Sequence, residues 1–376
     1  MDMSELSFDC HRADLAAGVN QVKSLVRDGD ALNPFRNIRI SSRGNGQIAI
    51  SASNDDLMAE TLVDAKVTVE GVVCVPGTKF AAFVNAMPAG RVSFVVAGGR
   101  ATLRNGESSF GVVVADPQSF CEMHRPSVDA VSMSMGATVL AEMLRKVEYA
   151  ASRDKTRYVL SGVNFATKKT DDGYVLMLTA TDGRRLSNVS SAVCGDMEAS
   201  FTLGNDAVKE LHARLNGDSD GMVTVESDGK TSFSRGERWS LWTKLVELPY
   251  PSWGRVVPTD VPNVAMIDRA TFAEEVKRVS LAADRDGAFS GIHLTFKDGA
   301  CVLEAGSEMA TSRSAMVVKY SGADVKLSVD PKLVLDVLGA IDEHEIKFMF
   351  KDGSSSFMIQ CLVPFIGVIM PLREAE

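Results

Sequence analysis

The chain has 376 residues, 45% of them hydrophobic and 24% charged, which is typical of a globular protein and excludes intrinsic disorder. Forty Lys and Arg against 49 Asp and Glu leave a net charge of −9, which argues against a protein that grips duplex DNA through many phosphate contacts. No apolar run reaches the ~18 residues of a membrane helix, and the opening residues MDMSELSFDCHR lack the pattern of a secretory signal. We therefore expect a cytoplasmic protein that does not bind membranes.

Two amphipathic helices are predicted in the first third of the chain, within residues 14–27 and 78–88. Apolar side chains recur there at the spacing of a helix face. In the first helix they are Leu15, Val19, Val22 and Val26, and in the second they are Phe80, Phe83, Val84 and Met87. Strand-forming residues surround both helices, for example at 50–55.

The rest of the chain repeats this arrangement twice. Four further helices are predicted to start at Ala137, Asn205, Asp268 and Asp330. Each has an apolar face at helical spacing. In the same order, these faces contain Leu140, Met143, Leu144 and Val147; Val208, Leu211 and Leu215; Phe272, Val276 and Val279; and Leu333, Val334, Val337 and Ile341. Strand-forming segments at 178–183 and 303–308 resemble residues 50–55.

The regular spacing of these elements indicates three copies of one fold. The six helices start 59–68 residues apart, and the matching alanines of the strand segments, Ala52, Ala180 and Ala305, are 128 and 125 residues apart. A turn-rich stretch at 115–127 and a Pro-punctuated connector at 257–262 separate the copies. We predict an α+β fold of three domains, each with two helices and antiparallel sheets, at residues 1–127, 128–260 and 261–376.

Basic residues recur on the helix faces opposite the apolar stripes, whereas acidic residues concentrate in loops and strands. The basic positions are Lys23, Arg27, Lys79, Arg145, Lys146, Lys209, Arg214, Arg269, Lys277, Arg278 and Lys332. A protein that is acidic overall but basic along its helices has an uneven field, and its helices favour a polyanion. The alternative is an ordinary solvated helix surface.

Three motifs carry a specific resemblance. They are Thr156-Arg-Tyr-Val-Leu-Ser-Gly followed by Thr181-Asp-Gly-Arg-Arg-Leu186, Pro251-Ser-Trp-Gly-Arg-Val256, and the closing Val368-Ile-Met-Pro-Leu-Arg373. Together with the threefold repeat, they make the whole chain resemble the bacterial sliding clamp, the β subunit of DNA polymerase III. This resemblance implies a head-to-tail homodimeric ring with helices inside, which encircles duplex DNA without sequence preference. It implies no catalysis, no cofactor and no metal.

The resemblance also implies which residues face DNA. They are Lys23, Arg27, Lys79, Arg145, Lys146, Arg153, Tyr158, Lys209, Arg214, Lys277 and Arg278. Loose attraction between these bases and phosphates would centre the ring on DNA without pinning it.

In the family, the replicative polymerase, the clamp loader and repair proteins dock short linear peptides in a hydrophobic cleft. The matching positions are Leu160, Thr181, Gly183, Arg184, Arg185, Leu186, Pro251, Arg255, Val256, Ser356, Val368, Ile369, Met370, Pro371, Leu372 and Arg373. The apolar members suit leucine or phenylalanine anchors, and Arg185 and Arg255 are expected at the rim. The alternative for these residues is ordinary strand-core packing.

Two departures from the family pattern bear on the cleft. Arg184 stands where a histidine is common, and the chain continues as Glu374-Ala-Glu376, where the family commonly ends in an apolar residue after the arginine. For the ring interface, the resemblance implies that Ser109, Phe110 and Val112 of one chain face Val279 and Leu281 of the other.

Two other classes of function were weighed. An enzyme is disfavoured because the five histidines form no metal-spaced pair and the sequence holds neither a phosphate loop nor a nucleophile elbow. A repeat-built scaffold that binds only proteins, or a clamp paralogue outside the main replicative role, remains the alternative to a processivity factor.

Overall fold

The computed structural model describes residues 5–29, 33–127, 129–154, 156–195, 197–217, 221–283, 291–362 and 364–373. The chain divides into two compact units, Met1–Thr138 with Lys209–Leu245, and Val139–Val208 with Val246–Glu376. This division differs from the predicted cuts near 127 and 260. The reason is that β17 (Trp239–Lys244) pairs with β4 (Leu57–Asp64), which joins residues of the middle third to the first sheet.

The first unit contains two antiparallel sheets. The smaller has the order β5-β1-β7-β8-β9, and the larger runs β10-β15-β16-β17-β4-β3-β2-β6. Their remaining bounds are β5 Lys66–Val69, β1 Ser7–His11, β7 Arg91–Ala97, β8 Arg100–Asn105, β9 Ser108–Val113, β10 Val131–Gly136, β15 Met222–Ser227, β16 Thr231–Arg235, β3 Gln47–Ser53, β2 Asn37–Ser42 and β6 Val72–Pro76.

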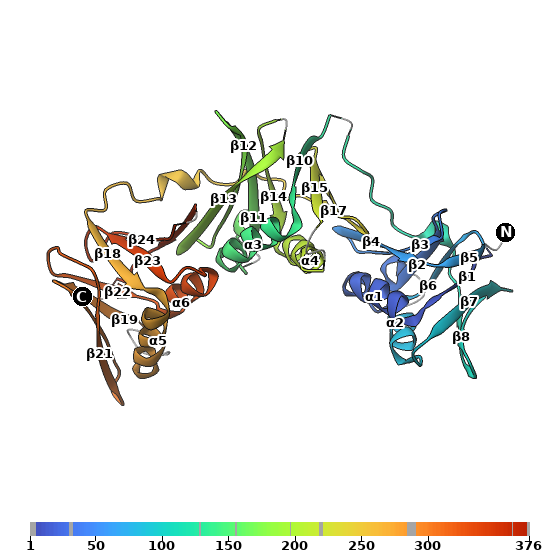
Figure 1. The fold of residues 1–376 in the computed structure, drawn as a ribbon, viewed down its shortest axis with the longest axis horizontal. Coiled ribbons are helices and arrows are strands. Elements are labelled where there is room, and N and C mark those ends of the chain that lie inside the picture. The colour runs from blue at the N-terminus through green and yellow to red at the C-terminus, as the bar shows by residue number, and fades with distance from the viewer. Residues whose placement is uncertain are drawn as a thin grey trace. The chain divides into compact units, whose positions relative to one another are not determined.

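Helices α1 (Arg12–Val22) and α2 (Gly77–Ala86) lie side by side in this unit, and α1 packs on β3 and β4 (Figure 1). Most of their apolar stripes are buried as predicted, with Leu15, Val19 and Phe80 fully enclosed. Phe83 of the predicted stripe is instead 38% exposed and stacks on Phe110. Helix α1 ends at Val22 and continues as a short 3-10 turn, so Val26 lies beyond the helix rather than on it. This ends the stripe one turn earlier than its spacing predicts.

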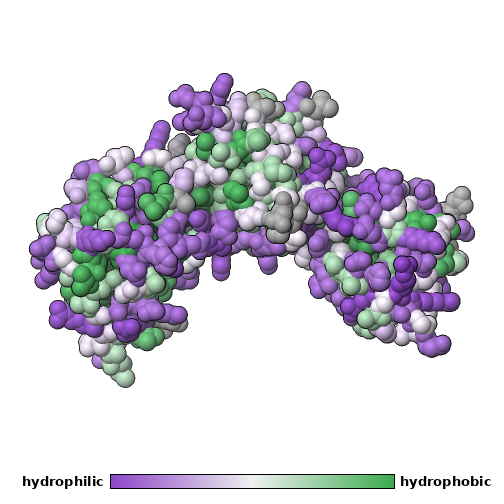
Figure 2. Space-filling model, viewed as in Figure 1, coloured by the Kyte–Doolittle hydropathy of each residue, from purple (hydrophilic) through white to green (hydrophobic). Residues whose placement is uncertain are grey.

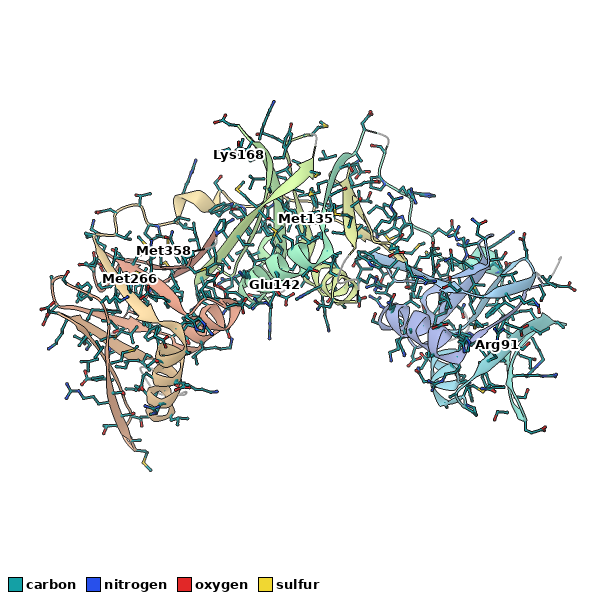
Figure 3. All side chains as sticks on the ribbon, viewed as in Figure 1. Arg91, Met135, Glu142, Lys168, Met266 and Met358 are labelled. Carbon is teal, nitrogen blue, oxygen red and sulfur yellow. The ribbon has the colours of Figure 1, made fainter. Side chains whose placement is uncertain are left out.

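The second unit also has two antiparallel sheets. One has the order β14-β11-β12-β13-β25-β24-β23-β18, and the other β21-β20-β19-β22. Their bounds are β14 Ala199–Gly204, β11 Gly162–Thr170, β12 Gly173–Thr181, β13 Arg185–Gly195, β25 Phe365–Ile369, β24 Phe357–Gln360, β23 Glu345–Phe350, β18 Asn263–Asp268, β21 Thr311–Val317, β20 Ala300–Gly306, β19 Ile292–Lys297 and β22 Val325–Val329. Met266 on β18 and Met358 on β24 mark the first of these sheets in Figure 3.

Helices α5 (Arg269–Val279) and α6 (Pro331–Ala340) pack against each other in this unit. Both begin at an aspartate that caps the first turn: Asp268 accepts from the backbone N–H of Thr271, and Asp330 from that of Lys332. Helices α3 (Ala137–Val147) and α4 (Asn205–Leu215) complete the set. The six α-helices of the described residues thus confirm the six predicted starts.

Polar and charged side chains cover most of the face drawn in Figure 2, with smaller apolar areas between them. Within the described part of the chain, no helix is long and apolar enough to cross a membrane.

Candidate functional site

A cavity of about 230 Å³ opens beside the first residues of β13 and the last residues of β25. Three other segments complete it: a 3-10 turn ending at Leu160, the turn before β13, and the connector around Trp253. Its lining consists of Leu160, Thr181, Gly183, Arg184, Arg185, Leu186, Pro251, Ser252, Trp253, Val256, Val368 and Met370. We call this cavity the cleft.

The floor and the walls of the cleft differ in exposure. Leu186 and Val368 form a cross-strand pair of β13 and β25 and are buried. Met370 and Val256 are large apolar residues that remain exposed beside this floor. The backbone N–H of Met370 donates to the carbonyl of Arg184 at 2.9 Å, which extends the strand pairing to the mouth of the cleft. An apolar side chain could therefore bury itself against a preformed surface.

The turn at Asp182–Arg184 is held rigidly. Oδ1 of Asp182 accepts from the backbone N–H groups of Arg184 and Arg185, at 2.9 and 3.1 Å. Gly183 has a φ of +87°, a conformation that residues with a Cβ rarely adopt. The hydroxyl of Thr181 accepts from the N–H of Gly183 and donates to the carbonyl of Arg185. The side chains that follow this turn consequently start from fixed positions.

Arg185 lies in the cleft wall but does not form the free rim that the sequence suggested. Its side chain is only 9% exposed and binds three groups: Oδ2 of Asp182 at 3.0 Å, Oδ2 of Asp336 at 2.5 Å and the carbonyl of Tyr149 at 2.6 Å. Burial raises the pKa of Asp336, but hydrogen bonds from Lys332 and Arg185 outweigh it and leave that pKa below its ordinary value. The prediction that Arg185 offers donors to a peptide is therefore wrong; the residue ties the cleft to α6.

Ten of the predicted cleft residues line the cavity, and six do not. Those outside are Arg255, Ser356, Ile369, Pro371, Leu372 and Arg373. Ile369 is fully buried, and Leu372 donates its N–H to the carbonyl of Ser328, so both serve the packing of the sheet. Ser252 and Trp253 also line the cleft but were not predicted to do so. The signal was an indole in the segment between Pro251 and Pro258, which suits the wall of an apolar site. The tail residues Glu374–Glu376 lie outside the described residues.

The first unit contains a strand pair at the matching position of the repeat, with different side chains. Met58 and Leu186 each stand six residues after the matching alanines Ala52 and Ala180. The cross-strand partner of Met58 is Trp242, whereas that of Leu186 is Val368. The indole of Trp242 packs with Met58, Phe120 and Phe233 in one apolar cluster, which we call the plug. Met58 and Trp242 also line a separate pocket of about 570 Å³, whose lining is richer in charged residues than that of the cleft.

Comparison with known families accounts for the repeat. Three family models of the DNA polymerase III beta subunit match in chain order: the N-terminal domain at residues 6–124, the central domain at 134–252 and the C-terminal domain at 254–372. The chain belongs to the bacterial sliding-clamp family. Three clamp domains of mixed helices and antiparallel sheets, as predicted, are thus confirmed.

Individual relatives agree with this family. The beta sliding clamp of Streptomyces coelicolor is 27% identical over 332 residues, which cover 84% of this chain and 83% of that protein. Among solved structures, a DnaN sliding clamp from Pseudomonas aeruginosa bound to griselimycin has a TM-score of 0.91 at 20% identity, and covers 98% of this chain and 99% of its own. A clamp from Bartonella birtlesii, also bound to griselimycin, has the same TM-score at 23% identity, with 98% of this chain and 100% of its own covered.

Most of the residues that the clamp family would turn toward DNA have exposed side chains. These are Lys23, Arg27, Lys79, Arg153, Tyr158, Lys209, Lys277 and Arg278; Lys146 is half-buried. Arg27 is paired with Asp55, and Arg278 with Glu275. Arg145 is also half-buried and binds both Glu142 and Asp342. Glu142, on α3, is labelled in Figure 3. Arg145 therefore holds two segments together and is a weaker candidate for a phosphate contact.

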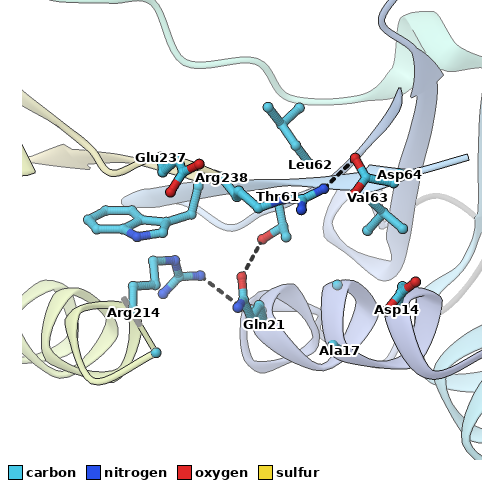
Figure 4. Close-up of a pocket in the computed structure, with 13 residues that line it drawn as sticks. Asp14, Ala17, Gln21, Thr61, Leu62, Val63, Asp64, Arg214, Glu237 and Arg238 are labelled. Atoms are coloured by element: carbon cyan, nitrogen blue, oxygen red, sulfur yellow. Dashed lines mark hydrogen bonds and ion pairs between the residues drawn. The ribbon is translucent and has the colours of Figure 1, made fainter. Parts of the chain in front are cut away.

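Arg214 contradicts the prediction that it faces DNA. Its side chain is 2% exposed, pairs with Glu210 at 2.6 Å and donates to the carbonyl of Gln21 at 2.7 Å (Figure 4). The same close-up shows Gln21 bound to Thr61 and Asp64 bound to Arg238. Glu210 and Arg214 are spaced i,i+4 on the helix, but this spacing alone does not show that the arginine is enclosed. Arg214 therefore stabilises the packing of α4 against α1.

Two of the five predicted interface residues point into their own domain. Val112 and Val279 are buried, the latter completely, because Val279 belongs to the apolar stripe of α5. The side chains of these two residues therefore pack within the chain, and the interface at their positions stays a prediction. Leu281 is 84% exposed, Ser109 is exposed, and Phe110 is half-buried and stacks on Phe83. Strands β9 and β21 each stand at the end of their sheet order.

Proposed function

We propose that the chain is a DNA polymerase processivity factor that works as a homodimeric ring around duplex DNA in the cytoplasm. It tethers the replicative polymerase, the clamp loader and repair proteins through short peptides. The observation that carries the proposal is the occurrence of three clamp domains in one chain together with an open apolar cleft beside the paired strands β13 and β25. We retain 1–127, 128–260 and 261–376 as the proposed domain boundaries.

Within this proposal, the cleft is the peptide site. Leu186 and Val368 provide a buried floor, Met370 and Trp253 provide adaptable walls, and together they suit leucine or phenylalanine anchors. The protein acts by binding partner peptides and by encircling DNA, and neither action needs a catalytic group or a cofactor. In the described part of the chain, no group of three metal-binding side chains occurs.

Contact with DNA is proposed to be weak and independent of sequence. The exposed lysines Lys23, Lys209 and Lys277 supply positive charge on a chain whose net charge is −9. A few separate cations attract phosphates without fixing the position of the duplex, and so allow sliding. The unpaired edges of β9 and β21 are the proposed ring interface, with Ser109, Phe110 and Leu281 nearby.

One experiment tests the ring directly. The protein is loaded onto a nicked circular DNA, and retention is measured before and after the circle is linearised, alongside the mass in solution. A closed clamp has the mass of two chains, stays on the circle and leaves after linearisation. A protein-binding scaffold would show no difference between circular and linear DNA, and that result would overturn the proposal.

A further inference from the structure

We propose that Arg184 makes the cleft select partner peptides that carry a carboxylate beside their apolar anchor residues. This inference rests on the proposed peptide-binding function of the cleft and names the chemistry that it prefers. The occupant to which we commit is an extended peptide with one or two large apolar side chains and a neighbouring Asp or Glu.

One exposed cation lies in the otherwise nearly uncharged lining of the cleft. Among the described residues that line the cleft, only Arg184 and Arg185 are charged. Arg185 is 9% exposed and already has three partners, whereas the Arg184 side chain is 56% exposed. A ligand in the cleft therefore meets one accessible guanidinium, which offers several N–H donors to a carboxylate.

Arg184 has a partner, Asp330, that the carboxylate of a ligand could replace. Its Nη2 lies 3.0 Å from Oδ2 of Asp330, while Oδ1 of Asp330 accepts from the backbone N–H of Lys332. Asp330 thus keeps its role as the cap of α6 if Arg184 turns away. An ion pair with a largely exposed arginine contributes little to stability, so a peptide carboxylate can replace Asp330 with little loss to the fold.

The backbone of Arg184 is fixed, whereas its side chain is largely exposed. Its N–H donates to Asp182, and its carbonyl accepts from Met370. The backbone at the mouth of the cleft therefore need not move when the guanidinium contacts a peptide. The entropic cost of that contact is limited to the ordering of one side chain.

The charges around the mouth of the cleft favour an acidic ligand group. Asp182 has both carboxylate oxygens engaged by Arg184 and Arg185, and therefore does not repel a ligand as a free carboxylate would. Arg157 donates to the carbonyl of Asp182 at 2.7 Å and adds positive charge beside Gly183. The rim complements an acidic ligand group rather than a basic one.

A double-mutant cycle between protein and peptide tests the inference. Two labelled peptides share the same leucine and phenylalanine anchors and differ only by an Asp-to-Asn change beside them. Their Kd values are measured by fluorescence anisotropy on the full-length protein and on Arg184→Gln, at low and high salt. We expect the wild-type protein to bind the Asp peptide about 5- to 10-fold more tightly than the Asn peptide at low salt, and Arg184→Gln to show less than about a twofold preference.

Two control variants sharpen the result. Arg157→Gln removes a neighbouring charge that does not line the cleft, and is expected to keep most of the preference for the Asp peptide. Asp330→Asn can still cap α6 but no longer competes as a charged partner, and is expected to increase the preference.

The possible failures are distinguishable. Equal binding of the two peptides to the wild-type protein would overturn the role of Arg184 and leave the peptide site intact. Failure of both peptides to bind would overturn the proposed function of the cleft itself. An unchanged preference of Arg184→Gln for the Asp peptide over the Asn peptide would show that another residue causes the selectivity. That result would also reject the inference.

Discussion

The guanidinium of Arg185 lies 2.5 Å from the carboxylate of Asp336, and this contact joins the wall of the cleft to α6. The neighbouring Arg184 reaches Asp330, the cap of the same helix. Two consecutive arginines thus have separate roles, because one is enclosed in the fold and the other faces the solvent. Substitutions of enclosed and of exposed side chains are therefore expected to have different effects on stability and binding.

Replacement of Arg185 is expected to destabilise the protein. Arg185→Ala leaves Asp182 and Asp336 without their shared partner, and we expect a loss of about 3 kcal/mol in the free energy of unfolding. Arg184→Ala, which breaks a largely exposed pair, is the matched control and should cost less than about 1 kcal/mol. Urea unfolding of both variants checks the prediction, and equal losses would contradict it.

The Asp336 contact also predicts a dependence on pH. Its pKa in the folded protein lies below the ordinary value of 3.8, so folding favours the carboxylate form. This stabilisation is present above the unfolded pKa and is lost as the pH falls through the folded one. Asp336→Asn should therefore be less stable than wild type at pH 7, and the difference should shrink below about pH 4. Urea midpoints measured from pH 7 to pH 3 give the comparison; a constant gap would refute it.

The plug predicts different effects for two tryptophans. Trp242 is buried among Met58, Phe120 and Phe233, so Trp242→Ala should lower the free energy of unfolding by about 3–5 kcal/mol. Trp253 is half-exposed in the cleft wall, so Trp253→Ala should weaken peptide binding at a smaller cost in stability. Chemical denaturation and peptide titration of both variants separate the two roles. A Trp242→Ala protein as stable as wild type would show that the plug is loosely packed.

The reactivity of the cysteines shows which thiols are enclosed in the folded protein. Burial raises the pKa values of Cys10, Cys74 and Cys301 to about 12, so at pH 8 these thiols are protonated as well as enclosed. Cys121 and Cys194 are exposed. A maleimide should label these two rapidly and leave the three buried thiols untouched until urea is added. Peptide mapping identifies the sites, and early labelling of Cys74 would indicate that the segment around Phe120 opens readily.

The exposed lysines should matter for DNA, whereas Arg214 should matter for the fold. Lys23, Lys209 and Lys277 reversed together to Glu should reduce retention on circular DNA while the protein remains folded and dimeric. Arg214→Ala should instead lower the unfolding midpoint, because it breaks the contacts with Glu210 and Gln21. Unchanged retention of the triple variant would count against the proposed DNA-facing surface.

The helices could be predicted because they depend on local pattern, whereas the cleft residues were expected only from the resemblance to the clamp family. The apolar spacing of Phe272, Val276 and Val279 determines the buried face of α5, and the same spacing argues against Val279 as an interface residue. Arg185 and Arg214 were harder to place. Their partners Asp336 and Gln21 are far away in sequence, so that only the fold shows that these arginines are enclosed.

The enclosure of Trp242 gives the protein an optical signal of its own. Its indole is 8% exposed among Met58, Phe120 and Phe233, so water reaches it only when this cluster opens. The fluorescence of the tryptophans in the first unit should then shift to longer wavelength as that unit unfolds, without any attached dye.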